Sequence, residues 1–227
     1  MIKVRYLKTF FFFVLILFTS QYLYAQTTKV FSEAKGSGKD QTLYKYERWN
    51  FHLGNKKYEI KKNGKGTENN GKNRTANFRI KLERGEELER IVYFSQYQGD
   101  IILICESVLG DGSGGLMARL NGSSLRTKWQ SSIPAFNIAK GLIENNSAYL
   151  AAIGFIGKIN LETGKFIWKQ DDLYLKYDES GAFNVFLTPR INRNLVIFKE
   201  ADVLGRGFDH QIHVNKTSGK IVKVILK

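Results

Sequence analysis

The sequence predicts an all-β fold, and three observations indicate it. Short runs of apolar and β-branched residues alternate with turns rich in glycine, asparagine and serine along most of the chain. No segment repeats its apolar residues with the sustained period of about 3.6 that marks an amphipathic helix. One kind of turn also recurs at long intervals, which predicts β-propeller-like repeats, about four in number, in a small or incomplete ring.

The clearest repeat unit is the stretch 148–170. Its strands are predicted at 148–153, 155–160 and 165–169. A tight turn joins the last two strands, with Thr163 at a corner and Gly164 supplying the positive φ that closes the turn. Trp168 follows on the return strand.

A second copy of this turn begins at Asn121. Aligning Asn121 with Asn160 places Trp129 opposite Trp168, because each tryptophan follows its asparagine by eight residues. The same spacing in two places is the strongest sign of a repeat. The turn residues themselves are predicted to build the fold.

Two further copies extend the repeat. Asn215 aligns with Asn160, which places Gly219 opposite Gly164. A weaker copy starts at Lys81. The intervals between the copies are 40, 39 and 55 residues. A period near 40 built from short strands is typical of propeller blades. The longer interval predicts an added connection at 171–179, with a helical turn in it.

The rest of the chain is predicted to hold short strands and one long loop. Further strands are expected at 43–51, 58–62, 88–94, 101–108, 116–120, 125–129, 183–187, 195–198, 211–214 and 220–226. A turn is expected at 52–57 and another at 110–115. The segment 63–75 contains no large apolar residue, so we interpret it as a long exposed loop.

The unit 148–170 resembles the blade of the quinoprotein-type, or PQQ-like, β-propellers. In that family a strand ends in aspartate or asparagine, and a turn with Thr-Gly-Lys leads to a tryptophan, as at 160–168 here. The resemblance covers roughly residues 77–227. It implies structural roles, in which the tryptophan fills space between blades and the glycine closes the turn. Complete rings of the family usually have more blades than residues 26–227 can supply.

Catalytic members of that family hold a quinone cofactor in a larger ring, with a stacking tryptophan, calcium-binding acidic residues and often adjacent cysteines. This chain has one cysteine, Cys105, and no such acidic set can be assigned. We expect Cys105 to be a buried, inert thiol. We also expect no cofactor, no metal and no catalytic residues. A propeller enzyme that binds a quinone or another cofactor is the alternative.

The N-terminal residues 1–25 have the layout of a secretory signal peptide. Three basic residues precede the apolar run 10–19, and Ala25 is a small residue at the expected cleavage site. The run is shorter than the roughly 20 residues that span a bilayer. We therefore expect an exported protein, periplasmic or secreted, with no transmembrane segment in the mature chain. A flexible lead-in is predicted at 26–42 and a single domain at 43–227.

Basic charge is the remaining signal, with 35 lysines and arginines against 21 acidic residues. A candidate patch for an anionic partner consists of Lys56, Lys57, Lys61, Lys62, Lys65, Lys72 and Arg74. For an exported protein the expected anions are lipopolysaccharide, wall polymers, anionic lipid or an acidic protein, and not nucleic acid. A merely solvated face is the alternative.

The expected function is that of a non-enzymatic interaction or scaffold module in the cell envelope. A periplasmic immunity protein is an alternative within the same class. The three histidines, His52, His210 and His213, lie in no context that matches a catalytic triad. His210 and His213 would also point to opposite faces of one strand, which argues against a metal pair.

Overall fold

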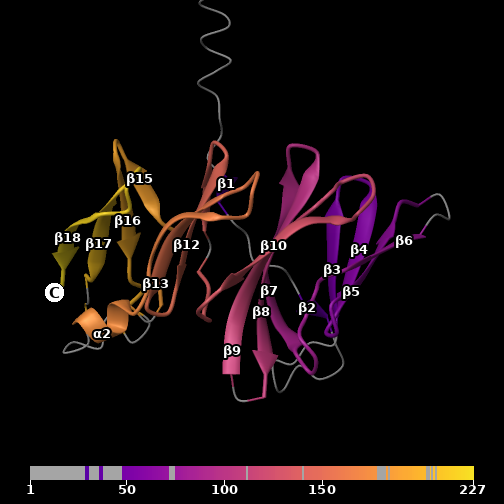
Figure 1. Ribbon diagram of the computed structural model, residues 1–227, viewed down its shortest axis with the longest axis horizontal. Coiled ribbons are helices and arrows are strands. Elements are labelled where there is room, and N and C mark those ends of the chain that lie inside the picture. The colour runs from indigo at the N-terminus through magenta and orange to yellow at the C-terminus, as the bar shows by residue number, and fades with distance from the viewer. Residues whose placement is uncertain are drawn as a thin grey trace, which may run out of the picture.

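The chain is described by a computed structural model that covers residues 29–30, 36–37, 48–71, 75–110, 112–139, 141–177, 183, 185–202, 205, 207 and 209–227. The predicted signal peptide, 1–25, lies outside this part, and the predicted lead-in is described only at 29–30 and 36–37. Within the described residues, β-strands form four antiparallel sheets (Figure 1). The prediction of an all-β, propeller-like fold with about four repeats is confirmed.

Apart from β1 (Lys29–Val30), which joins the third sheet, the strands follow one another from the first sheet to the fourth. The first sheet contains β2 (Gly36–Ser37), β3 (Arg48–Leu53), β4 (Lys56–Lys61), β5 (Lys65–Asn69) and β6 (Thr75–Arg79). The second contains β7 (Glu87–Tyr97), β8 (Asp100–Leu109), β9 (Gly112–Leu120) and β10 (Thr127–Ile133). The third contains β1, β11 (Leu142–Glu144), β12 (Ser147–Ala152), β13 (Phe155–Asn160) and β14 (Phe166–Gln170). The fourth contains β15 (Arg190–Asn192), β16 (Leu195–Lys199), β17 (Gln211–Asn215) and β18 (Ile221–Ile225).

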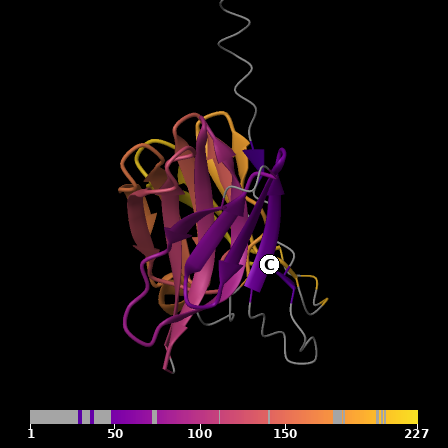
Figure 2. The same cartoon turned by 90° about the vertical axis from the view of Figure 1, so that its right-hand side faces the viewer.

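Each sheet is a meander whose successive strands pair antiparallel, with β2 added to the edge of β3 and β1 to the edge of β11. The sheets lie side by side in chain order, and the first and fourth are at opposite ends of the row (Figure 1). Figure 2, turned by 90°, shows the first sheet in front of the others. The described sheets are not closed into a ring.

The hydrophobic core lies between neighbouring sheets, because each strand turns every second side chain toward the next sheet. Trp49 and Ile60 of the first sheet share a buried cluster with Leu103 of the second. A second cluster joins the second and third sheets, and a third joins the third and fourth. Each sheet therefore depends on its immediate neighbours, as in other repeat architectures.

The prediction of a long loop at 63–75 is wrong, because β5 occupies 65–69 and lies between β4 and β6 in the first sheet. Its inward positions are Gly66 and Glu68, neither of which gives an apolar signal. A Cβ on Gly66 would lie 2.1 Å from the Phe78 ring, so the missing side chain leaves room for that ring. Glu68 is buried and accepts a hydrogen bond from Lys56 at 3.1 Å. This strand can lack large apolar side chains because the Phe78 ring fills the space beside Gly66. The charge of buried Glu68 is compensated by Lys56.

Three other local predictions are corrected. The turn predicted at 52–57 is shortened to two residues, 54–55, between β3 and β4. The turn predicted at 110–115 ends before Gly112, where β9 begins. In the described part of 183–187, the predicted strand is replaced by a single bridge between Phe186 and Glu200. The helical turn in the long connection is present as α2 (Leu173–Tyr177).

The weak repeat copy at Lys81 is also wrong. The three strong copies join the third and fourth strands of a meander, β9 to β10, β13 to β14 and β17 to β18. Lys81 instead lies in the connection from β6 to β7, which links the first sheet to the second. Its spacing of 40 residues from Asn121 therefore does not place it at an equivalent position.

Candidate functional site: a cationic sheet face and the contacts between sheets

The three strong repeat turns have one geometry. The Asn160 side-chain oxygen accepts hydrogen bonds from the backbone N–H groups of Glu162 and Thr163, at 2.9 and 3.0 Å. The Asn160 carbonyl accepts the Gly164 N–H at 2.8 Å. Asn121 and Asn215 make the same contacts with the residues that follow them, namely Ser123, Ser124, Leu125, Thr217, Ser218 and Gly219. Asparagine suits this position because its side chain replaces a backbone acceptor.

The fourth residue after each asparagine has a positive φ, at Leu125 (57°), Gly164 (70°) and Gly219 (72°). Glycine at the last two positions has a second cause. A Cβ on Gly164 would lie 2.5 Å from the Trp129 ring, and one on Gly219 would lie 2.5 Å from Trp168. Each tryptophan thus packs directly on the turn of the following sheet, which needs a glycine there.

The tryptophans also bond to the neighbouring sheet. Trp129 Nε1 donates to the Leu161 carbonyl at 3.0 Å, and Trp168 Nε1 donates to the Lys216 carbonyl at 3.2 Å. Both acceptors belong to the residue that follows a repeat asparagine. The structure therefore places Trp129 and Trp168 in contacts that hold one sheet against the next.

Two cations that the sequence analysis missed share these acceptors. Arg119 Nη1 donates to the Leu161 carbonyl at 2.9 Å, and Lys158 Nζ donates to the Lys216 carbonyl at 3.2 Å. Each cation stands two residues before a repeat asparagine. That common spacing is the signal that could have identified them, although one is arginine and the other lysine.

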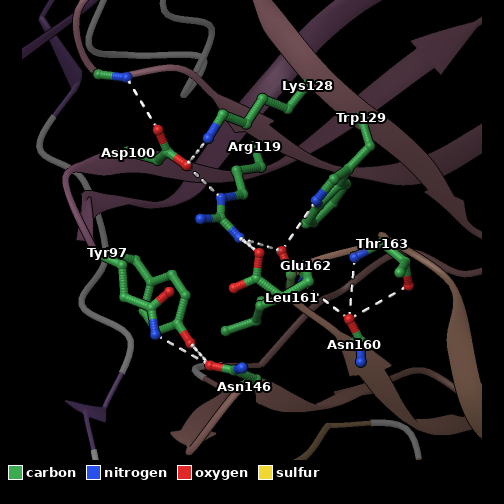
Figure 3. A network of polar contacts seen from close by, with 12 residues as sticks. Tyr97, Asp100, Arg119, Lys128, Trp129, Asn146, Asn160, Leu161, Glu162 and Thr163 are labelled. Carbon is green, nitrogen blue, oxygen red and sulfur yellow. Dashed lines mark hydrogen bonds and ion pairs between the residues drawn. The ribbon is translucent and has the colours of Figure 1, made fainter.

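A polar network surrounds Arg119 between the second and third sheets (Figure 3). Buried Asp100 accepts hydrogen bonds from Arg119 Nε and Lys128 Nζ, both at 2.6 Å, and from the Gly122 backbone at 3.2 Å. Glu162 in the third sheet's turn pairs with Arg119 at 2.8 Å. Burial alone would raise the pKa of Asp100, but hydrogen bonds from Lys128 and Arg119 outweigh it and hold that pKa below its usual value. These charges satisfy one another, so the network is structural.

A second buried carboxylate is also used inside the fold. Glu106 binds Arg90 through two hydrogen bonds of 2.8 Å and accepts the Ile138 N–H at 2.5 Å. His210 Nδ1 lies 2.7 Å from Glu200, and both side chains are buried. These pairs connect strands to the loops that cover them.

The predicted basic patch is divided by the structure. Lys57, Lys61 and Lys65 are exposed on the face of the first sheet that points away from the second sheet. Lys72 and Arg74 lie outside the described residues. The exposed residues alternate with the buried ones along β4 and β5, which places them on one face.

Lys56 and Lys62, by contrast, are partly buried and paired. Lys56 binds Glu68 at 3.1 Å, and Lys62 binds Glu87 at 2.6 Å. Their charges are therefore largely neutralised within the fold.

The outward face of the first sheet carries a straight row of four cations. Arg48 of β3 is paired across the sheet with Lys61 of β4, and Lys65 of β5 with Arg79 of β6. Lys61 and Lys65 end and begin the two central strands, on either side of a three-residue turn. All four side chains are exposed. We call this set the cation row.

Arg48 and Arg79 were not predicted from the sequence, because the row depends on the register between strands. Alternation along β3 and β6 would have put both residues on the outward face. Placing them beside Lys61 and Lys65 also requires the two turns of this sheet. The turn at 54–55 was predicted too long, and the turn at 62–64 was predicted as the start of a long loop. In the described residues, the only carboxylate paired with the row is Glu59, 3.3 Å from Arg48.

A hollow of about 440 Å³ opens beside Arg48 and Lys61, and its other walls are Lys62, Asn63 and Glu87. Three of the five lining side chains are cationic, and one, Glu87, already pairs with Lys62. The hollow can admit an anionic group between Arg48 and Lys61. Arginine suits such a group, since its planar guanidinium binds phosphate and carboxylate through two parallel hydrogen bonds.

The remaining candidate groups occupy ordinary positions. Cys105 is buried, and burial raises the pKa of its thiol well above the usual range. The pKa of His213 is lowered by burial and by nearby Lys223. Among the residues that the structure describes, no three His, Cys, Asp or Glu side chains group as metal ligands. None of the helices in that part is long and apolar enough to cross a membrane.

No protein-family model matches the chain, and no curated protein does so either. Several solved structures are similar. BamB from Moraxella catarrhalis is 15% identical, with a TM-score of 0.45 over 75% of this chain and 49% of BamB. The computationally designed Ika8 protein is 12% identical, with a TM-score of 0.44 over 78% of this chain and 48% of its own.

An enzyme is among the similar structures as well. The quinohaemoprotein alcohol dehydrogenase ADHIIG from Pseudomonas putida HK5 is 11% identical, with a TM-score of 0.49 over 87% of this chain and 36% of the dehydrogenase. The chain spans about half the length of BamB and of Ika8. These likenesses concern the fold and not the site.

Proposed function

We propose that this protein is an exported, non-enzymatic interaction module with PQQ-like blades, and that it binds an anionic partner of the cell envelope through the cation row. One observation carries the proposal. Four exposed cations stand side by side across four strands, with one carboxylate among the described residues to offset them.

Such a row costs stability. Like charges directly opposite each other on neighbouring strands destabilise a sheet. Elsewhere in the described residues, Asp100, Glu106 and Lys62 each have a partner of opposite charge. A partner that brings negative charge to the row would remove the repulsion and gain affinity from it.

A solvated cap is the competing interpretation of this face. The end sheet of a repeat protein needs a polar outer surface to stay soluble. Charges of both signs would satisfy that need equally well and without repulsion. The single sign of the row therefore supports binding over solubility alone.

The test captures partners from envelope extracts with the mature protein, residues 26–227, as bait. The row variant R48Q/K61Q/K65Q/R79Q is compared with a control, R190Q/K165Q/R193Q/K220Q, which also removes two arginines and two lysines, but from exposed positions in the third and fourth sheets and their turns. We expect the control to retain the wild-type partner and the row variant to lose it. The proposal fails if both variants behave alike.

A further inference from the structure

The outward face of the first sheet lacks the anchors that other kinds of partner need. Apart from the row, Lys57 and Glu59, its positions hold Asn50, His52, Thr67, Asn69, Thr75 and Asn77. None of these side chains is a large apolar group or an aromatic platform other than the single imidazole. The face therefore offers charge and hydrogen bonds.

This composition argues against a folded protein as the partner. The centre of a protein interface is usually depleted of charge, and its affinity comes from buried aromatic or arginine anchors seated in pockets. Lysine is disfavoured there, yet Lys61 and Lys65 occupy the centre of this row. Single-stranded nucleic acids bind proteins partly by stacking their bases on aromatic side chains, and this face has no such side chain apart from the His52 imidazole.

A polyanion gains affinity differently. Each cation that neutralises a phosphate releases condensed counterions, and this gain requires no apolar contact. The row spans three strand spacings of about 4.8 Å, or about 14 Å in all. A single small anion can reach one pair of these cations, whereas an extended chain can reach all four.

We infer that the cation row binds a linear, phosphate-bearing polymer that lies across β3, β4, β5 and β6. The hollow beside Arg48 and Lys61 receives one phosphate of the chain, with Asn63 as a further hydrogen-bond donor. The asparagine and threonine side chains of the neighbouring positions bond to the polymer's oxygens. This inference rests on the proposed function and names the chemistry of its partner.

The experiment measures binding of long-chain inorganic polyphosphate to the mature protein over a range of salt concentrations. The wild type and the R190Q/K165Q/R193Q/K220Q control should bind equally well. The row variant R48Q/K61Q/K65Q/R79Q should bind at least about tenfold more weakly. Its slope of log K against log salt should be smaller by about 3, since each lost phosphate contact removes roughly 0.7. Inorganic phosphate should compete poorly.

Three further measurements complete the test. Unchanged thermal unfolding of the row variant, and a partial loss of binding in the milder variant K61Q/R79Q, would show that the loss is not a folding defect. Binding to vesicles of phosphatidylglycerol in place of polyphosphate would overturn the polymer and indicate a bilayer surface. If polyphosphate binds no variant but the extract partner still depends on the row, the inference falls and the proposed function stands. If neither polyphosphate binding nor partner capture depends on the cation row, both the inference and the proposed function are wrong.

Discussion

At the scale of single residues, the contacts between sheets depend on a glycine and a tryptophan that meet across the gap. Trp168 packs on Gly219 and donates to the Lys216 carbonyl, and Trp129 does the same with Gly164 and Leu161. The sequence was sufficient to predict these residues, because the eight-residue spacing from asparagine to tryptophan is a local pattern. It could not show that each ring serves the turn of the next sheet.

Gly219→Ala tests this contact against backbone strain. Gly54 is the control, since its φ is 62°, near the 72° of Gly219, but a Cβ there would meet nothing within 4 Å. Gly54→Ala should cost about 1 kcal/mol of unfolding free energy from strain alone. Gly219→Ala should cost about 1–3 kcal/mol more, because its Cβ overlaps the Trp168 ring. Urea denaturation measures both, and equal losses would contradict the packing account.

Asp100→Asn tests the buried network through pH. The folded state holds the pKa of Asp100 below its unfolded value, so its contribution is present above about pH 4 and is lost as pH falls through the folded pKa. The substitution should cost about 3 kcal/mol at pH 7, since Arg119 loses a buried partner. The difference in stability from wild type should narrow as pH falls from about 4 through the folded pKa of Asp100.

Chemical denaturation across that pH range provides the measurement, and Asp172→Asn, at an exposed position, is the control. A difference that does not narrow as pH falls below about 4 would show that the Asp100 charge contributes nothing.

At the scale of elements, the first sheet shows where prediction from sequence fails. Most strands were predicted, since apolar runs mark strands buried on both faces. β5 was missed because its inward positions are glycine and a paired glutamate. The cation row was missed because its members come from four strands, and only the paired register brings them together. Information of that kind is not local in the sequence.

Lys65→Thr tests whether the row strains its sheet. Removing one central cation should raise the free energy of unfolding by about 0.2–1 kcal/mol at low salt, because Lys65 faces Arg79 directly. Screening should reduce the gain as salt rises toward 1 M. The same change at Lys165, away from the row, should give no gain. A loss of stability in Lys65→Thr at low salt would mean that the repulsion is unimportant.

At the scale of the whole molecule, the four sheets occupy two kinds of position, inner and terminal. The inner sheets bury both faces against their neighbours, and the tryptophan, cation and glycine contacts hold the second sheet to the third and the third to the fourth. The first sheet buries one face against the second sheet. Its other face, which carries the cation row, points outward at one end of the molecule (Figure 1). The repeat pattern in the sequence predicted the architecture, while the surface at its end is a property of the assembled sheet.

The most direct test of the proposed binding face is an amide NMR titration of residues 26–227 with polyphosphate. Shift changes should be confined to β3, β4, β5 and β6, be largest near Arg48, Lys61, Lys65 and Arg79, and disappear in the row variant. Changes centred on the third or fourth sheet, or changes that persist in the row variant, would contradict the account.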